Sequence, residues 1–353
     1  MSHIALIQQR LGALEALILT DPASIRYASG FFITDGAAVI ARNRAFLITD
    51  SRYLEAAGQS VHDMELLCSS RHKSLKTILG EIVAQNGYQA VGGEENRISH
   101  GDWSALEDAI GVPMQSAGSL LAGLRASKDE AEVAAIRAAQ QISERALDEV
   151  LGIIRPGMTE KELAAELVYR MYKYGGEANS FDPIVVTGKK TSMPHGVPGD
   201  EAIAPGDFIT MDFGTMYNGY CSDMTRTVAL GSVTDEMKTV YQTVLEAQLA
   251  GIAAARPGVP GREVHMAARE IIEKAGYGPY FDHGFGHSLG LEIHEPPNAS
   301  PSNPEPLPAG AVISAEPGIY LPGRFGVRIE DMLWLREDGA VNLTSAPKEL
   351  IIL

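Results

Sequence analysis

The chain is poor in cysteine and contains no long apolar run. Two cysteines, Cys68 and Cys221, lie too far apart in 353 residues to suggest a disulfide framework, which favours a reducing compartment. No stretch approaches the roughly 18 apolar residues that a membrane-spanning helix needs. The N-terminal Met1–Arg10 lacks the basic and apolar regions of a secretory signal. We therefore expect a cytoplasmic protein without a membrane partner.

Basic residues are also scarce. Lysine and arginine total 29 against 45 aspartates and glutamates, which gives a formal net charge of −16. A phosphate backbone would be repelled by such a surface, so nucleic acid is not expected as a partner. The same excess of carboxylates is typical of ordinary solubility, and cation binding must therefore be argued from individual positions.

The length and composition predict two globular domains. Hydrophobic residues make up 45% and charged residues 21%, as in packed soluble proteins. Because 353 residues exceed the usual size of one domain, we expect a small N-terminal α/β domain over residues 1–124 and a larger domain over residues 125–353.

The first third of the chain has the pattern of a small α/β domain. Leu14–Thr20 is mostly apolar up to an Asp-Pro turn, and Ala37–Ala41 and Ala45–Thr49 flank the turn Arg42–Arg44. A helix from about Lys73 is expected to end at Asn86 and Gly87, which is a favourable left-handed cap. Near the domain boundary, Ser127 with Glu130 suggests a capping box at the start of a long helix.

Two motifs recur in the larger domain. Arg155–Met158, before the predicted capping box of Thr159 and Glu162, resembles Arg256–Val259. Phe-Asp at 181–182 recurs at 281–282 with nearly the same spacing. Arg-Pro-Gly is a common lead-in to helices, so chance stays an alternative, but the joint recurrence favours two related halves around a shared site.

Two predicted hairpins bring carboxylates together. Asn218 and Gly219 form a favourable two-residue loop, which places Asp223 opposite Gly214 and on the same sheet face as Asp212.

The second hairpin, with Pro322–Arg324 as its loop, places Glu316 opposite Glu330. Facing carboxylates destabilise a sheet unless a cation lies between them or one is protonated. One such pair alone is more typical of a solvated surface. Two pairs beside the histidine-rich stretch 282–294 predict a metal site, because imidazole and carboxylate together suit transition metals.

Spaced in this way, the motifs resemble the metallopeptidase family that includes prolidase, aminopeptidase P and methionine aminopeptidase, whose fold is called pita-bread. The resemblance covers Ser127–Leu353, and Thr49–Tyr53 is similar to the proline-specific members. It implies a pita-bread catalytic domain, a creatinase/prolidase-type N-terminal domain and two divalent ions, with manganese expected before cobalt, iron or zinc. The implied metal ligands are Asp212, Asp223, His287, Glu316 and Glu330, with Asp223 and Glu330 bridging.

The resemblance also assigns residues that do not bind metal. His195 and His294 would hydrogen-bond the substrate carbonyl and its oxyanion, and Arg328 would anchor a carboxylate. His283 also matches, and Glu316 is the expected proton acceptor. His294 falls in a segment expected to be extended, and Ser288 stands where the family more often has glycine. The remaining histidines are expected to be structural: His3, His62, His72, His100 and His265.

By resemblance, we expect a homodimeric enzyme that hydrolyses the bond between an N-terminal residue and proline in peptides. The alternatives are an Xaa-Pro dipeptidase, a methionine aminopeptidase, a creatinase-like amidinohydrolase and a non-catalytic peptide-binding relative. The separate domain over residues 1–124 weighs against a methionine aminopeptidase, and the complete ligand set weighs against the last two.

Overall fold

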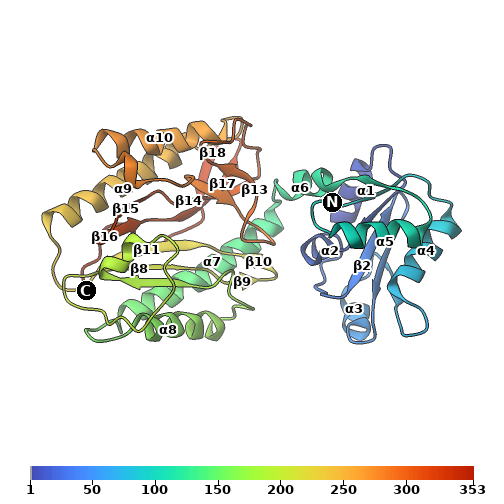
Figure 1. The fold of residues 1–353 in the computed structure, drawn as a ribbon, viewed down its shortest axis with the longest axis horizontal. Coiled ribbons are helices and arrows are strands. Elements are labelled where there is room, and N and C mark those ends of the chain that lie inside the picture. The colour runs from blue at the N-terminus through green and yellow to red at the C-terminus, as the bar shows by residue number, and fades with distance from the viewer. Residues whose placement is uncertain (1) are drawn as a thin grey trace. The chain divides into compact units, whose positions relative to one another are not determined.

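The computed structural model describes residues 2–353, and the chain divides into two compact units, Met1–Arg125 and Ala126–Leu353 (Figure 1). Each unit has its own sheets and its own buried apolar cluster. Within residues 2–353, no helix is both long and apolar enough to cross a membrane.

The N-terminal unit is built on one six-stranded sheet in the order β4-β3-β2-β1-β5-β6. β1 runs antiparallel to β2 and parallel to β5, so the sheet is mixed. Its strands are β1 (Ala16–Leu19), β2 (Gly36–Ala41), β3 (Arg44–Thr49), β4 (Glu65–Cys68), β5 (Val91–Gly93) and β6 (Met114–Ser116). Its helices are α1 (His3–Arg10), α2 (Pro22–Ser29), α3 (Leu54–Ser60), α4 (Leu75–Asn86), α5 (His100–Ile110) and α6 (Gly118–Arg125).

Local sequence accounts for most of these boundaries. Gly87 has a φ of 69° and caps α4 in the left-handed conformation, as expected. The β2–β3 turn is one residue shorter than expected, because Ala41 already pairs with Arg44. Asp21 does more than make a turn, since its side chain accepts a hydrogen bond from the Ser24 N–H and caps α2.

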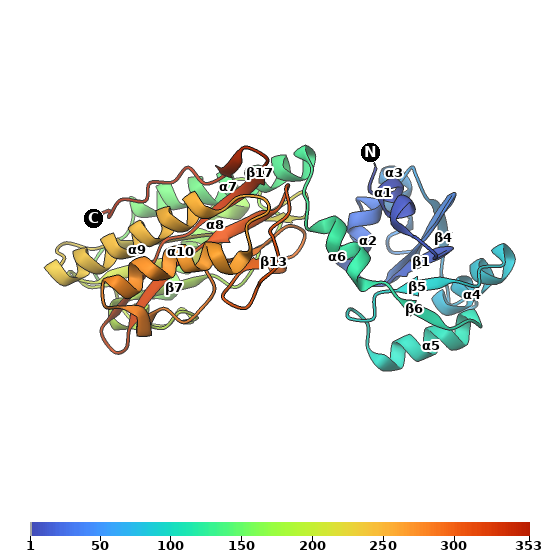
Figure 2. The same ribbon diagram turned by 90° about the horizontal axis from the view of Figure 1, so that it is seen from above.

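In the C-terminal unit, strands lie between two pairs of helices (Figure 1). Figure 2 shows α9 and α10 running alongside each other. The helices are α7 (Glu130–Leu151), α8 (Glu160–Lys173), α9 (Asp235–Ala254) and α10 (Gly261–Lys274), with short 3₁₀ turns η1 (Gly188–Ser192) and η2 (Gly278–Tyr280).

The strands of this unit form two main sheets and two ribbons. One sheet has the order β11-β8-β7, the other β13-β12-β14-β17-β18, and the ribbons are β10-β9 and β15-β16. The bounds are β7 (Ile184–Thr187), β8 (Phe208–Phe213), β9 (Met216–Tyr217), β10 (Tyr220–Cys221), β11 (Met224–Ala229), β12 (Gly286–Ser288), β13 (Glu295–Ala299), β14 (Val312–Ala315), β15 (Gly318–Leu321), β16 (Phe325–Arg328), β17 (Asp331–Arg336) and β18 (Gly339–Asn342).

The two halves of this unit repeat the same local backbone, which confirms the duplication. Gly157 and Gly258, the glycines of the two Arg-Pro-Gly motifs, have φ angles of 84° and 83°. Their N–H groups donate to Ile203 O and Leu307 O, each at 2.9 Å. Both motifs therefore turn the chain into a helix with the same left-handed glycine and the same cross-chain hydrogen bond.

The long helix α7 starts later than expected. Its N-cap is Asp129, which forms a capping box with Glu132, so the assignment of Ser127 and Glu130 was wrong. The Ser127 hydroxyl instead donates to Ala309 O at 2.7 Å, which holds it outside the helix. The capping box of Thr159 and Glu162 on α8 is confirmed.

His265 is a buried imidazole with an unusual environment. It lies on α10, its ring stacks on Phe281 with centroids 5.3 Å apart, and neither ring nitrogen has a hydrogen-bond partner within residues 2–353. Burial lowers the pKa of His265 to about 4, because the interior disfavours the charged form.

This burial predicts a pH-dependent loss of stability. Below pH of about 6.5 the unfolded chain gains a proton on His265 that the folded chain takes up only near pH 4, so stability falls as the pH falls through this window. At pH 5 the loss from this group is about 2 kcal/mol. The free energy of unfolding should therefore drop between pH 7 and pH 5, and we expect this drop to be about 2 kcal/mol smaller in His265→Leu than in the unsubstituted chain.

The measurement is urea unfolding of the chelator-treated protein, followed by Trp334 fluorescence in a Trp103→Phe background so that the C-terminal unit is observed. His72→Leu, at an exposed histidine, is the control and should keep the original pH dependence. An unchanged pH dependence in His265→Leu would show that this imidazole is protonated in the folded state.

Candidate active site

One cavity of about 1030 Å³ in the C-terminal unit contains every residue singled out from the sequence. The residues come from both halves of the unit and include the five expected ligands and the four accompanying groups. They are His195, Asp212, Asp223, His283, His287, His294, Glu316, Arg328 and Glu330.

The first hairpin has the expected register. Tyr217 pairs with Tyr220 and Asp212 pairs with Thr225, on either side of a loop whose Asn218 and Gly219 have φ angles of 48° and 77°. Two positive φ angles in succession are what a type I′ turn requires, which is why Asn-Gly specifies it. Asp212 lies on β8, and Asp223 lies in the link between β10 and β11.

The second hairpin also has the expected register. Gly318 pairs with Arg328, and the loop 322–324 joins the strands. Glu316 and Glu330 lie just beyond this paired stretch. The Glu316 N–H donates to Phe285 O at 2.8 Å, and the Glu330 N–H donates to Thr225 O at 3.1 Å. The second contact fixes Glu330 directly against β11 of the first hairpin.

The carboxylates and His287 converge in a small volume. Ligand atoms of Asp223, His287 and Glu330 all lie within 4.8 Å of one another. His287 Nε2 is 3.5 Å from Asp223 Oδ2 and 3.4 Å from Glu316 Oε1. The Oδ1 atoms of Asp212 and Asp223 are buried and lack a hydrogen-bond partner within residues 2–353. Unpartnered buried oxygens at one point leave acceptor positions for a cation.

Burial and mutual repulsion change the acidity of this cluster. Burial, with Asp223 and Glu316 nearby, raises the pKa of Glu330 well above its usual range. Burial raises the pKa of Asp223 to about 7 although His287 opposes the shift, and it raises the pKa of Asp212 despite Arg328. Burial opposes the charged form of His287, yet Asp223 and Glu316 raise its pKa to about 9. A divalent cation would replace the protons that these shifts retain, so the donor set fits a metal.

Arg328 holds the centre of the cluster. Its guanidinium donates to Asp212 Oδ2 at 2.6 Å, Tyr320 OH at 2.9 Å and Thr225 Oγ1 at 3.0 Å, and it approaches Pro194 O at 3.4 Å. Arg328 lines the cavity but is 4% exposed, and its guanidinium is bonded to these protein groups, which offset its charge.

Tyr320 is a site residue that sequence reasoning missed. Its hydroxyl contacts Arg328 and lies 3.0 Å from His283 Nε2. His283 Nδ1 contacts Gly284 O at 2.8 Å, so both nitrogens of that ring are used within the protein. The available signal was strand alternation, which puts Tyr320 and Glu316 on the same side of the chain.

The other two histidines are less constrained. His294 lies in a bend before β13, which corrects the expected extended segment, and its ring centroid is 4.4 Å from that of His287. Burial lowers the pKa of His294. His195 is exposed, and no hydrogen bond to its ring is found within residues 2–353. Both rings therefore keep polar atoms available to a substrate.

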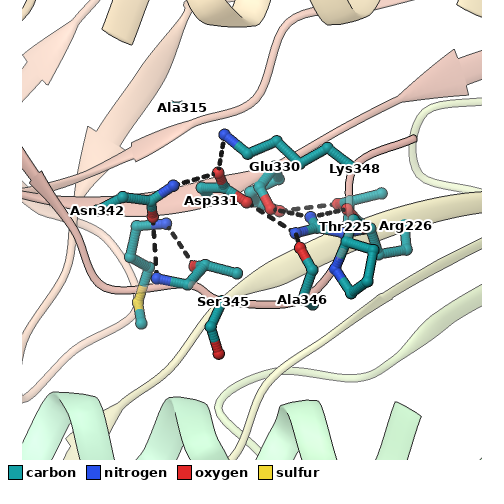
Figure 3. A network of polar contacts seen from close by, with 12 residues as sticks. Thr225, Arg226, Ala315, Glu330, Asp331, Asn342, Ser345, Ala346 and Lys348 are labelled. Atoms are coloured by element: carbon teal, nitrogen blue, oxygen red, sulfur yellow. Dashed lines mark hydrogen bonds and ion pairs between the residues drawn. The ribbon is translucent and has the colours of Figure 1, made fainter. Parts of the chain in front are cut away.

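A buried network behind the carboxylates centres on Arg226 (Figure 3). Its guanidinium donates to Glu330 O at 2.6 Å, Thr225 O at 2.9 Å and Asp331 Oδ1 at 2.8 Å. It also donates to the carbonyls of residues 346 and 347 at 2.7 and 2.8 Å. Figure 3 shows Asp331 between Arg226, Lys348 and Asn342, and each contacts its carboxylate. The network thus joins both ligand-bearing hairpins to the C-terminal segment.

A second buried pair supports the segment that carries His287 and His294. Lys128 Nζ lies 3.3 Å from Glu295 Oε2 and 3.4 Å from Ser288 Oγ. The Ser288 hydroxyl donates to Val312 O at 2.6 Å. The Ser288 side chain on β12 is therefore held by a hydrogen bond to the neighbouring strand β14.

Comparisons with known proteins identify the family of each unit. A model described as Metallopeptidase family M24 matches residues 134–337, and one described as Creatinase/Prolidase N-terminal domain matches residues 6–127. An uncharacterized peptidase of Bacillus subtilis, YqhT, is 39% identical, with 96% of each chain covered.

Solved structures of similar proteins match almost the whole chain. An Xaa-Pro dipeptidase from Bacillus anthracis has a TM-score of 0.95 at 38% identity, covering 99% of both chains. An X-Pro aminopeptidase from Thermotoga maritima has a TM-score of 0.93 at 39% identity, covering 98% of this chain and 99% of that one.

The pita-bread fold and its acidic cavity define a metallopeptidase, and hence a hydrolase. The chain belongs to metallopeptidase family M24, with a creatinase/prolidase-type domain at its N-terminal end.

The network in Figure 3 predicts a strong dependence of stability on Arg226. Arg226→Met leaves five acceptors, including the Asp331 carboxylate, without their buried cation. Removing one partner of a buried ion pair costs about 3–5 kcal/mol, and we expect a loss of that size in the free energy of unfolding of the C-terminal unit.

Denaturant unfolding followed by Trp334 fluorescence, again in a Trp103→Phe background, checks this prediction. Lys238→Met is the control, because Lys238 lies in an exposed pair with Asp235 at 3.6 Å on α9 and should contribute less than about 1 kcal/mol. Equal effects of the two substitutions would mean that the buried network is energetically neutral.

Proposed function

We propose that the acidic cavity holds two divalent ions and that the enzyme removes an N-terminal residue that precedes proline. The carrying observation is the convergence of three buried carboxylates, one half-buried carboxylate and one imidazole in a cavity that also contains two uncommitted histidines. The proposed ligands are Asp212, Asp223, His287, Glu316 and Glu330, with Asp223 and Glu330 bridging. A mainly oxygen donor set with one imidazole favours manganese over a thiolate-bound zinc.

The residues around the ions would divide the work of amide hydrolysis. When bound, divalent ions lower the pKa of an attacking water and polarise the scissile carbonyl. Glu316, which contacts His287 and the Ser314 hydroxyl, would accept the proton of that water and pass it to the leaving amine. His294 and His195 would donate hydrogen bonds to the carbonyl oxygen as it gains charge.

Arg328 and His283 would not contact the substrate but would hold a ligand carboxylate in position. Arg328 fixes Asp212, and His283 contacts the Tyr320 hydroxyl that also binds Arg328. This chain of contacts would keep one ligand carboxylate oriented during turnover.

We propose aminopeptidase rather than dipeptidase action because of the charges in the cavity. An Xaa-Pro dipeptide carries its free carboxylate on the residue next to the scissile bond, and burying that charge requires a cationic partner. Among the residues of the described chain that line the cavity, Arg328 is the one lysine or arginine, and its guanidinium is already taken up by Asp212 and Tyr320.

The rim of the cavity is instead neutral or acidic. Asn298 and Ser300 line it and hydrogen-bond each other at 2.8 Å, while Asp182 and Asp282 are exposed. This lining suits a peptide that continues beyond proline better than a terminal carboxylate. The dipeptidase remains the second candidate, because similar proteins include the Bacillus anthracis Xaa-Pro dipeptidase. A homodimer in the cytoplasm stays a prediction.

The metal proposal predicts different outcomes for ligands and for the other histidines. We expect about two divalent ions per chain and loss of activity on chelation. Asp223→Ala should lose metal because it removes a bridging ligand, whereas His195→Ala and His294→Ala should retain both ions. His294→Ala should lower kcat about 10²–10³-fold, as expected for a donor that acts in the transition state.

Metal analysis of each purified variant together with steady-state kinetics provides the check. Full metal content in Asp223→Ala would remove the bridging role, and loss of an ion in His294→Ala would make that histidine a ligand. Activity that survives complete removal of metal would end the proposal.

The substrate proposal is tested with Ala-Pro, Ala-Pro-amide and Ala-Pro-Ala, assayed with the manganese-loaded enzyme. Ala-Pro and its amide differ only in the terminal charge, so their ratio isolates carboxylate recognition. We expect kcat/KM for the free dipeptide to be at least about tenfold below that for the amide and the tripeptide, since an unpaired buried charge costs more than about 1.4 kcal/mol. Ala-Ala-amide controls for the requirement for proline. Faster cleavage of the free dipeptide would favour the dipeptidase.

A further inference from the structure

Glu160 is a fully buried carboxylate outside the cavity. It is the first residue of α8, and its side chain has 0% exposure. The cap of this helix does not need the Glu160 side chain, because Thr159 and Glu162 already form the capping box. A buried charge that does not cap its own helix is costly unless it binds something else.

Its two oxygens bind both ends of one loop. Oε1 accepts a hydrogen bond from the Thr187 N–H at 2.8 Å, where β7 ends. Oε2 accepts from the Gly199 N–H at 2.8 Å, and also from Lys190 Nζ at 2.6 Å. The carboxylate is therefore saturated by three donors from a single stretch of chain.

Lys190 extends this clamp. Its ammonium group binds Glu160 and also Glu201, whose Oε2 lies 3.0 Å away. The side chain of Glu160 is buried and that of Lys190 is 19% exposed, whereas that of Glu201 is 55% exposed. The pair with Glu160 is thus the more shielded from solvent, and it carries most of the constraint.

The clamped loop carries His195. Residues 194–198 line the cavity, between the two backbone N–H groups that Glu160 binds. The middle of the loop is held by the Thr191 hydroxyl, which accepts from the Gly326 N–H at 2.9 Å, and by the contact of Arg328 with Pro194 O. Since the His195 ring has no hydrogen-bond partner within residues 2–353, only this backbone sets its place.

We propose that Glu160, with Lys190, is a positioning residue for catalysis that acts by fixing the His195 loop across the cavity. The inference rests on the proposed role of His195. Glu160 contacts neither substrate nor the acidic cluster, so its effect must pass through the loop. A loose loop would leave the imidazole poorly aimed, and misplacement of a donor by about 1 Å costs up to about 10²-fold in rate.

The test is a double-mutant cycle of Glu160→Gln and His195→Ala, with kcat and KM measured on Ala-Pro-amide in the metal-loaded enzyme. In Glu160→Gln, one acceptor oxygen becomes an NH₂ donor and the negative charge is lost. Whichever way the amide is turned, the NH₂ group faces a backbone N–H at one end of the loop, so the clamp is broken at that end with little change in volume. We expect kcat/KM to fall about tenfold in the His195 background and less than about twofold in His195→Ala. Metal content should stay at the unsubstituted level.

Glu162→Gln is the matched control on the same turn of α8, because glutamine also completes a capping box, and its kcat/KM should be unchanged. If Glu160→Gln does not fold, Lys190→Met opens the same clamp from the more exposed partner and takes its place in the cycle. Equal losses in both backgrounds would overturn the positioning role. Full activity of His195→Ala would instead overturn the proposed role of His195, so the two failures are distinguishable.

Discussion

Repulsion among buried carboxylates is the constraint on which the C-terminal unit depends. Asp212, Asp223 and Glu330 are buried close to Glu316, and burial and proximity both disfavour their ionised forms. Such a cluster stays together only if the backbone segments that carry the carboxylates are held at a fixed distance against this repulsion. The two hairpins meet this requirement, because their tight loops fix the register at which each carboxylate leaves its strand.

Two buried arginines divide the task of holding the cluster. Arg328 contacts the Asp212 carboxylate itself, while Arg226 binds the backbone carbonyls of Thr225 and Glu330. Arg328 therefore offsets the charge of a ligand, whereas Arg226 fixes the distance between two ligand-bearing segments. Because Arg226 is neutralised by Asp331, it adds rigidity without directing a net positive charge at the cavity.

The sequence predicted the parts of the site that depend on local rules. Asn218 and Gly219 allow one tight turn, and that turn determined where Asp212 and Asp223 lie. The family resemblance supplied Arg328, whose partner Asp212 is 116 residues away, but other long-range pairs were missed. Arg226 and Asp331 each lie close to a ligand residue in the sequence. Their pairing links positions 105 residues apart, and neither helical nor strand periodicity predicts a contact at that separation. Ser127 was misread for the same reason, since its hydroxyl binds a carbonyl 182 residues away.

The contacts of β11 also bear on the order in which the protein can be built during translation. Arg226 binds carbonyls of residues 346 and 347, and Ala229 exchanges backbone hydrogen bonds with residues 351 and 353. The hairpin with Asp212 and Asp223 leaves the ribosome more than a hundred residues before this segment, and domains fold as units once their parts are available. The contacts that hold β11 from the C-terminal side can therefore form only after the segment 346–353 has been synthesised.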